Sequence, residues 1–187
     1  MVRRSLIICV LLLGVMVFAQ SLFPKFALDD LRGGEVVLDS ILAHNKPVIV
    51  TYWATWCKQC IKELRSLKLY HAEQESIYGE PTFYVIALCE DGPRSKRNAI
   101  ALANKEGWEK FILPYDRGQK IKRKSGVAQI PELFILKPDG TIFYRHIGFN
   151  PGNEREIIAK LEELMDELSE NDNRGVEKNE NSGEQGE

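Results

Sequence analysis

The sequence has few of the residues that build metal centres. Its three histidines stand singly, at His44, His71 and His146, and it has four cysteines in 187 residues. A structural zinc site needs four ligands, commonly two close pairs of Cys or His, and only one such pair is present. We therefore expect neither a metal ion nor a bound cofactor.

The sequence also lacks an excess of either charge. It carries 25 basic and 27 acidic residues, a formal net charge of −2 at pH 7. Binding to nucleic acid phosphates needs a basic face, which this balance does not indicate. The length suits one domain with a core of ordinary size, so neither a second domain nor a repeat array is needed.

The N-terminus differs from the rest of the chain. Two arginines precede an apolar run from Leu6 to Phe18, and a small-residue cleavage pattern ends at Ala19. This predicts an export signal over residues 1–19, cut after Ala19. A retained membrane anchor is the alternative, although spanning a bilayer takes roughly 20 apolar residues. Either way the domain lies outside the cytoplasm, in the periplasm or an equivalent compartment, where disulfides persist.

The C-terminus differs in another way. From Ser169 to Glu187 the sequence holds six acidic and two basic residues, and Val176 is its one aliphatic residue. Such a segment cannot bury enough apolar surface to offset the entropy lost on ordering. We predict a disordered acidic tail over 169–187 and one folded domain over 20–168.

Hydrophobic patterning predicts alternating strands and helices in that domain. The segment 26–41 indicates a short strand, a Gly-Gly turn, a second strand and a helical turn. Residues 47–53 and 82–89 are apolar and β-branched, which is typical of strands buried on both faces. A long crossover separates them, so we expect parallel pairing. Residues 132–137 and 141–148 flank Pro-Asp-Gly, which predicts an antiparallel pair.

Three helices are indicated by apolar residues at helical spacing. One begins at or just before Cys57, a second lies around residues 99–103 and ends near Gly107, and the third is the last element of the domain. In the first helix the apolar face is Ile61, Leu64, Leu67 and Tyr70, and the other positions are Lys62, Glu63, Arg65 and Lys68. In the third helix the apolar face is Ile157, Ile158, Leu161, Leu164, Met165 and Leu168.

The stretch TYWATWCKQC carries the chemistry. A purely structural disulfide between Cys57 and Cys60 would close a very small loop and constrain the unfolded chain little, so redox exchange is favoured. At a helix start, Cys57 meets unpaired N–H groups and the positive end of the dipole, and Lys58 adds a positive charge. These features favour the thiolate, which is the nucleophile. We predict that Cys57 attacks and that Cys60, one turn inside the helix, resolves the mixed disulfide.

The strand ending in WATWCKQC at a helix start, followed by IPELFILKPDG, resembles the thioredoxin fold. In particular it is similar to exported thiol-disulfide oxidoreductases typified by TlpA and ResA. The resemblance covers about residues 26–168. It implies an α/β thioredoxin fold, in which helices flank a central mixed sheet and a β-hairpin is added at the N-terminus.

The resemblance also implies site residues. Pro131 would be cis and would lie against the cysteine pair, leaving the backbone of Ile130 free to bind an extended substrate. Trp56 would wall the same site, although tryptophans next to a strand also serve as packing residues.

This sequence departs from the family in places. Thr51 stands where cytosolic thioredoxins keep a buried aspartate, so the proton acceptor for Cys60 must come from elsewhere. Glu90 or Asp91 matches a place where some exported members keep an acid, but a plain loop carboxylate fits equally well. Cys89 ends a buried strand and is expected to be an inert small hydrophobe.

Two further departures bear on specificity. Gln59 stands where many relatives have proline, and Glu132 and Leu133 replace a common pair of threonines after the cis proline. The redox potential and the choice of partner are left open by these changes.

Two classes of function compete. The first is an exported reductase of protein disulfides, including cytochrome c apoproteins before haem attachment, recharged by a membrane electron donor protein. The second is a thioredoxin-fold binding or chaperone module with a structural disulfide. The intact WCxxC and the proline opposite favour the first. A peroxidase is disfavoured because Pro-x-x-x-Thr-x-x-Cys is absent around Cys57.

Overall fold

The computed structural model describes residues 21–183, with side chains described as far as residue 171. The predicted export signal, 1–19, lies outside the described residues. Within the described part, no helix combines the length and the apolar character needed to cross a bilayer.

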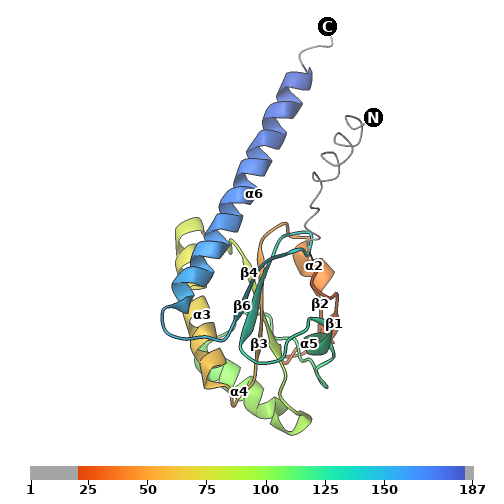
Figure 1. The fold of residues 1–187 in the computed structure, drawn as a ribbon, viewed down its shortest axis with the longest axis vertical. Helices are drawn as coiled ribbons and strands as arrows, with labels where there is room; N and C mark the ends of the chain where they lie inside the picture. Colours follow the sequence, from red (N-terminus) through yellow and green to blue (C-terminus); the bar gives the residue numbers. More distant parts are fainter. Residues whose placement is uncertain (1–20, 184–187) are drawn as a thin grey trace, which may run out of the picture.

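A four-stranded mixed sheet forms the centre of the domain (Figure 1), in the order β4-β3-β5-β6. Strand β3 (Val48–Trp53) runs parallel to β4 (Tyr84–Cys89) and antiparallel to β5 (Glu132–Leu136). Strand β6 (Ile142–Ile147) pairs antiparallel with β5. The parallel crossover and the antiparallel hairpin are both as predicted.

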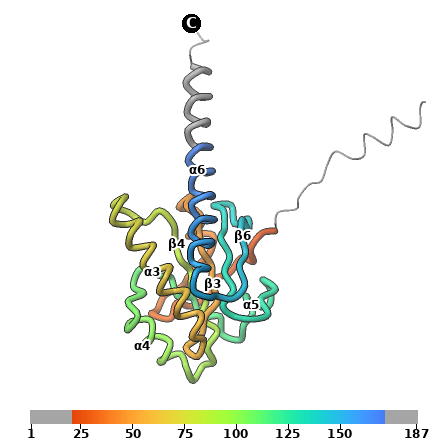
Figure 2. Tube along the Cα trace, turned by 60° about the vertical axis from the view of Figure 1, so that its left-hand side comes forward, coloured from red at the N-terminus to blue at the C-terminus, as the bar shows by residue number. Residues whose placement is uncertain are grey.

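Long helices cover one face of the sheet. Helix α3 (Lys58–Tyr78) and helix α6 (Asn153–Gly183) lie side by side there (Figures 1 and 2), and α4 (Lys96–Glu106) adds buried alanines to the same core. Gly107 ends α4 in the left-handed conformation, with φ 69°. Only glycine adopts such a φ at little cost, which is why the sequence marks this helix end.

Short elements cover the other face. The antiparallel pair β1 (Ala27–Asp29) and β2 (Glu35–Val37) is followed by α2 (Leu38–Leu42), and α5 (Lys120–Lys124) lies near them (Figure 1). Together with the other face they make the expected α/β architecture, a mixed sheet between helical layers with an added N-terminal hairpin.

Alternation along β3 divides the core in two. Ile49 and Trp53 belong to the cluster under α3 and α6, whereas Val50 and Tyr52 belong to the cluster under the hairpin, α2 and α5. Every residue of β3 is buried. Successive side chains of a strand point to opposite faces, so a strand covered on both faces carries apolar residues throughout.

Strand directions bring three connections to one edge of the sheet. Because β3 and β4 are parallel, both end at this edge, where Trp53 leads into α3 and Cys89 leads into the 3-10 helix η1 (Pro93–Ser95). Because β5 is antiparallel to β3, it starts at the same edge, just after Pro131. The residues predicted to do chemistry therefore meet there.

The C-terminal helix is longer than the sequence suggested. Disorder was predicted for 169–187, whereas the structure continues α6 to Gly183. A helix that is already nucleated by packing extends at little further cost, and the tail is rich in Glu, which is a good helix former. The composition of residues 169–187 alone does not show that they continue a helix that is already formed.

The packing of α6 on the sheet yields a stability prediction. Leu161 is fully buried, whereas Leu69 on α3 is 72% exposed. Leu161→Ala should lower the free energy of unfolding by roughly 2–5 kcal/mol, because it leaves a cavity. Leu69→Ala should change it by less than about 0.5 kcal/mol. Urea unfolding of both variants checks this, and equal losses would contradict the described packing of α6.

Candidate active site

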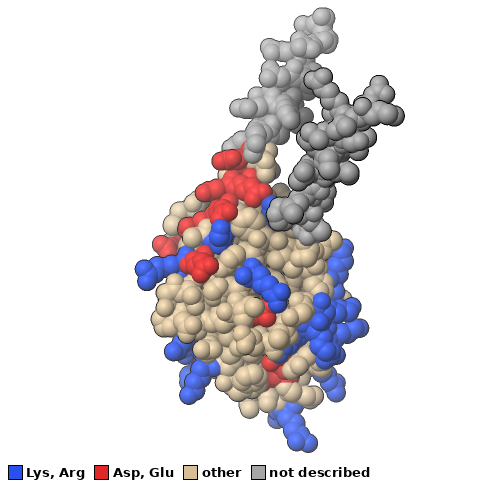
Figure 3. Space-filling model, in the orientation of Figure 1, with Lys and Arg blue, Asp and Glu red and all other residues tan. Residues whose placement is uncertain are grey.

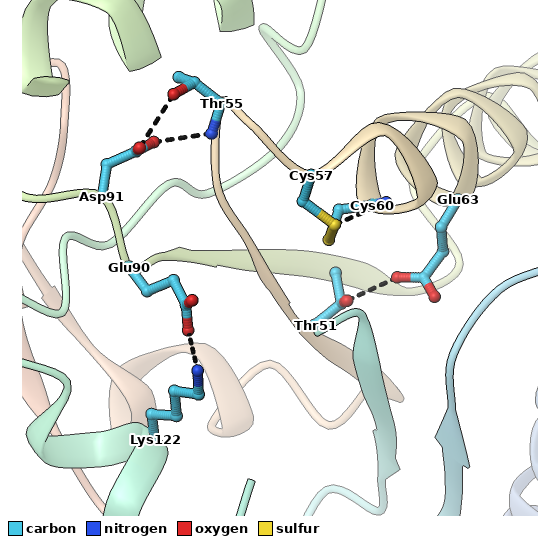
Figure 4. The surroundings of a disulfide bond; sticks show 8 residues. All are labelled: Thr51, Thr55, Cys57, Cys60, Glu63, Glu90, Asp91 and Lys122. Atoms are coloured by element: carbon cyan, nitrogen blue, oxygen red, sulfur yellow. Dashed lines mark hydrogen bonds and ion pairs between the residues drawn. A yellow bond between two sulfur atoms is a disulfide. The ribbon is translucent and has the colours of Figure 1, made fainter. Parts of the chain in front are cut away.

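The two cysteines of the motif form a disulfide at the start of α3 (Figure 4). Cys57 and Cys60 have an S–S distance of 2.04 Å and a Cα–Cα distance of 5.3 Å. Cys57 is the N-cap of α3, and the N–H of Cys60 donates to its Sγ at 3.2 Å. The first N–H groups of a helix have no partner within the helix, and here the sulfur atom of Cys57 accepts one of them. The predicted helix start is confirmed.

The two cysteines differ in accessibility. Cys57 retains 6% of its surface and Cys60 none. A partner sulfur atom therefore has access to Cys57 first.

The two tryptophans of the motif have different places. Trp53 is fully buried, donates from Nε1 to the carbonyl of Ala87 at 3.1 Å, and meets Trp108 edge to face with ring centroids 5.1 Å apart. Trp56 is 66% exposed. Trp53 therefore serves the core, and Trp56 offers an apolar surface next to Cys57.

The peptide bond between Ile130 and Pro131 is cis, as expected. Leu133 pairs with Thr51, and Pro131 directly precedes β5, so the proline lies at the end of the sheet where β3 leads into α3. The Pro131 carbonyl accepts a bond from the N–H of Gly148 at 2.8 Å, and the neighbouring Ile147 is 52% exposed. Ile130, just before the proline, is half-buried, so apolar side chains lie next to Pro131 both along the chain and on β6.

Glu132, the unusual residue after the proline, is held by an ion pair. Its side chain is buried and accepts from Nε of Arg145 at 2.5 Å. The same guanidinium donates to the carbonyl of Gly126 at 3.3 Å. The charge of Glu132 is thereby matched, and the segment before the proline is tied to β6.

Glu63 was assigned to the outer positions of α3 from the sequence, and this was wrong. It is 1% exposed, and its Oε1 accepts from the Thr51 hydroxyl at 2.5 Å. Its Oε2 is buried with no hydrogen-bond partner among the described residues. Burial raises the pKa of Glu63 to about 8, and the bond from Thr51 only partly opposes this. In Figure 4 the Glu63 carboxyl group and the disulfide both face the end of β3.

The spacing of α3 contains the signal that was overlooked. Position 63 is three residues after Cys60 and four before Leu67, so it shares their face of the helix. Thr51, at the position where cytosolic thioredoxins keep an aspartate, faces the same space from β3. The sequence signal for such a buried acid has two parts. The strand lacks the usual aspartate, and the facing helix carries a glutamate on its buried face.

The acids Glu90 and Asp91 have other partners. Glu90 pairs with Nζ of Lys122 at 2.5 Å, and both side chains are largely buried. Asp91 accepts from the N–H of Thr55 at 2.8 Å and from its hydroxyl at 2.9 Å. Figure 4 shows both carboxyl groups directed to these partners and not to the Cys57–Cys60 disulfide.

Cys89 is a buried free cysteine at the end of β4. Burial raises the pKa of its thiol to about 12, and its Sγ donates to Asp91 at 3.6 Å. A thiol held in this form is a poor nucleophile, which agrees with the inert role expected from the sequence.

Comparison with known proteins identifies the family. A family model described as the AhpC/TSA family matches residues 19–145. The chain belongs to the AhpC/TSA family. It is 33% identical over 137 residues to the thiol-disulfide oxidoreductase ResA of Bacillus thuringiensis, covering 73% of this chain and 74% of the relative.

Two more relatives agree. The thiol:disulfide interchange protein DsbE of Vibrio cholerae is 30% identical over 143 residues, covering 76% of this chain and 72% of the relative. A thioredoxin-like protein of Porphyromonas gingivalis, solved in solution, superposes with a TM-score of 0.65 at 31% identity, covering 78% and 92% of the two chains. The chain is thus a thiol-disulfide oxidoreductase with a thioredoxin-like fold, and the resemblance noted from its sequence is confirmed.

The buried Glu63 predicts a pH dependence of stability. Between its ordinary pKa of 4.5 and about 8, the unfolded chain releases the Glu63 proton and the folded protein keeps it. Glu63 therefore lowers the free energy of unfolding as pH rises through this window. The Glu63→Gln variant lacks this loss, and its stability relative to wild type should grow by at least about 1.4 kcal/mol between pH 5 and pH 8.

Urea unfolding of the oxidised protein at a series of pH values measures this difference. Glu73→Gln, an exposed position on the same helix, is the control and should give a constant difference. A pH-independent difference for Glu63→Gln would show that Glu63 is ionised in the folded protein at neutral pH.

Proposed function

We propose that the chain is an exported reductase of protein disulfides, cycling Cys57 and Cys60 between dithiol and disulfide. The observation that carries the proposal is the cysteine pair at the start of α3, with Cys57 accessible and Cys60 buried. Export is supported by the basic and then apolar composition of residues 1–19. A retained N-terminal segment would instead hold the domain at the outer face of the membrane.

The exchange has two steps. The Cys57 thiolate attacks one sulfur of a substrate disulfide, forming a mixed disulfide, and the departing substrate thiolate takes up a proton. Cys60 then loses its proton and attacks Sγ of Cys57, which releases the second substrate thiol. Two electrons pass from the cysteine pair to the substrate, and the pair is left oxidised.

We assign proton transfer from Cys60 to Glu63. The carboxyl group lies one turn further along α3, in the same buried space, with one oxygen free of hydrogen bonds among the described residues. Burial raises its pKa to about 8, so its carboxylate form is a stronger proton acceptor near neutral pH than an ordinary carboxylate. Glu90 and Asp91, the acids first considered, are occupied by Lys122 and Thr55 and serve better to hold their loop.

The substrate would lie along Pro131. Proline has no N–H, so the backbone of Ile130 remains as the hydrogen-bonding group for an extended substrate strand, a form of β-augmentation. The exposed side chains of Trp56 and Ile147 border this path and supply apolar contact.

The oxidised pair must be reduced again after each cycle. A membrane electron donor protein fits this need outside the cytoplasm, where thiol reductants are scarce. Cytochrome c apoproteins, whose cysteines must be reduced before haem attachment, are the substrates we propose. Support for both comes from the resemblance to the TlpA and ResA group.

Covalent trapping tests the roles of the two cysteines. Cys60→Ser should accumulate mixed disulfides with substrate, visible on non-reducing gels, because the resolving thiol is gone. Cys57→Ser should trap none and should lose reduction of insulin in the presence of dithiothreitol. Cys89→Ala is the control and should retain both activities.

Equal trapping by both serine variants would refute the assignment of roles. The binding-module interpretation would be correct if two results were found together. Wild type would fail to reduce insulin, and Cys57→Ser would keep unfolded insulin in solution as well as wild type does.

The role of Glu63 is tested separately. Glu63→Gln should slow resolution of the mixed disulfide by about 100-fold at pH 7, the lower part of the range for general base catalysis, and formation should be unaffected. The loss should shrink at alkaline pH, where ionisation of the thiol depends less on the carboxylate. Quenched-flow separation of the two steps measures this, with Glu73→Gln as the control. An unchanged resolution rate would remove Glu63 from the mechanism.

A further inference from the structure

Many cations on the described surface have a carboxylate partner. Such pairs are Lys25 with Asp39, Lys46 with Glu80, Arg65 with Glu106, Lys110 with Glu75, and Lys160 with Glu163. Other exposed cations, such as Lys58, Lys62 and Arg123, have no ion pair with a described residue, and five more lie on η1, α4, the segment before α5 and α5 itself. Arg94, Arg97, Arg117, Lys120 and Lys124 have no ion pair with any residue that the structure describes. We call these five residues the basic face.

The acids carried by the same loops are turned inward. Glu90 is buried against Lys122, Asp91 is buried against Thr55, and Asp116 accepts from two backbone N–H groups at the start of α5, at 3.2 and 2.9 Å. Glu90 is paired with a cation, and Asp91 and Asp116 accept from neutral donors inside the protein, which leaves the cations to dominate the outer surface of these loops.

The two parts of the basic face adjoin each other. A cavity of about 190 Å³ lies between η1 and the segment before α5, lined by Pro93, Lys96, Tyr115, Arg117 and Asp29. Nζ of Lys96 lies 5.3 Å from the centre of the Tyr115 ring. In the chain, Arg94 and Arg97 flank the lining residues Pro93 and Lys96, and Lys120 follows Arg117, whereas Lys124 lines a separate cavity beside Arg145. The exposed Asp29 is the acid among the residues that line the first cavity.

This surface is fastened to the redox centre. Asp91 holds Thr55, which is two residues before Cys57, and Glu90 joins the same loop to α5 through Lys122. Figure 3 shows Lys and Arg gathered on the flank where Figure 1 places α5, and Asp and Glu gathered along α6. Positive charge is therefore concentrated on the flank that carries α5, and negative charge along α6.

We infer that the basic face docks a partner protein whose redox cysteines lie next to an acidic surface. The inference rests on the proposed function, because the partner's sulfur atom must reach Cys57. Complementary charge steers such a partner, raises the association rate and orients it. A lipid bilayer is a poorer occupant, since it would cover the site where exchange takes place.

Peptide substrates of different charge test the inference. Three synthetic peptides with the same internal disulfide, flanked by Glu, Gln or Lys, are mixed with the reduced full chain, and acid-quenched samples give second-order rate constants. At low salt the Glu peptide should react at least about tenfold faster than the Lys peptide, and the ratio should fall towards one as salt screens the charges.

Two variants locate the effect. R94Q/R97Q/K120Q/K124Q should bring the Glu to Lys ratio close to one and leave the rate for the Gln peptide unchanged. The control removes four cations that are paired elsewhere, as K25Q/K46Q/K110Q/K160Q, with the same change in net charge. The control should keep most of the ratio.

Several results would overturn the inference. A ratio of the Glu to Lys rate constants near one for the wild type would show that charge does not select partners. If the control variant loses as much of this ratio as the first variant, the effect comes from the net charge of the protein and not from the basic face. If the wild type binds phosphatidylglycerol vesicles and the first variant fails to bind them, while both keep the same Glu to Lys ratio, the basic face binds a lipid surface and not a protein. Failure to reduce even the Gln peptide would instead overturn the proposed function on which the inference rests.

Discussion

The junction between β3 and α3 is the constraint on which the rest of the structure depends. Strand β3 is buried on both faces and paired on both edges, so it has no freedom to shift. At its end the chain turns within a few residues, with the N–H of Cys57 bonded to the carbonyl of Ala54 at 3.0 Å and Thr55 held by Asp91. The start of α3, and with it the sulfur of Cys57, is fixed by the strand.

Buried acids around this junction fall into two kinds. Glu90 and Asp91 have partners that match their charge or their acceptor capacity, so they fasten loops. Glu63 has one neutral donor and one oxygen without a partner among the described residues, an arrangement that favours its protonated form. A buried polar atom without a partner is costly, and such atoms concentrate where they serve chemistry. At this edge of the sheet, the presence of a cationic partner separates Glu90, which holds a loop, from Glu63, which has none among the described residues.

The strands, their directions, the start of α3 at Cys57 and the end of α4 at Gly107 could be predicted, because each has a local cause in periodicity or backbone conformation. The cis bond before Pro131 needed the family resemblance. Glu63 was missed because periodicity assigns charged residues outward, and a buried acid opposes that rule for a functional reason. Helix α5 is five residues long with one buried residue, Ile121, so it has no apolar periodicity by which the sequence could predict it, and Asp116 accepts from its backbone N–H groups.

The small exposure of Cys57 explains why docking and chemistry share one edge. With 6% of its surface accessible, Cys57 reacts only with a sulfur atom brought to it in a defined direction. The loops that give that direction must hold their shape, and the buried Glu90–Lys122 pair enforces this, since removing either partner leaves an uncompensated charge. The carboxylates that hold these loops are buried, so they do not contribute to the charge of the surface. The exposed cations of the same loops therefore determine the electrostatic potential that an approaching partner encounters.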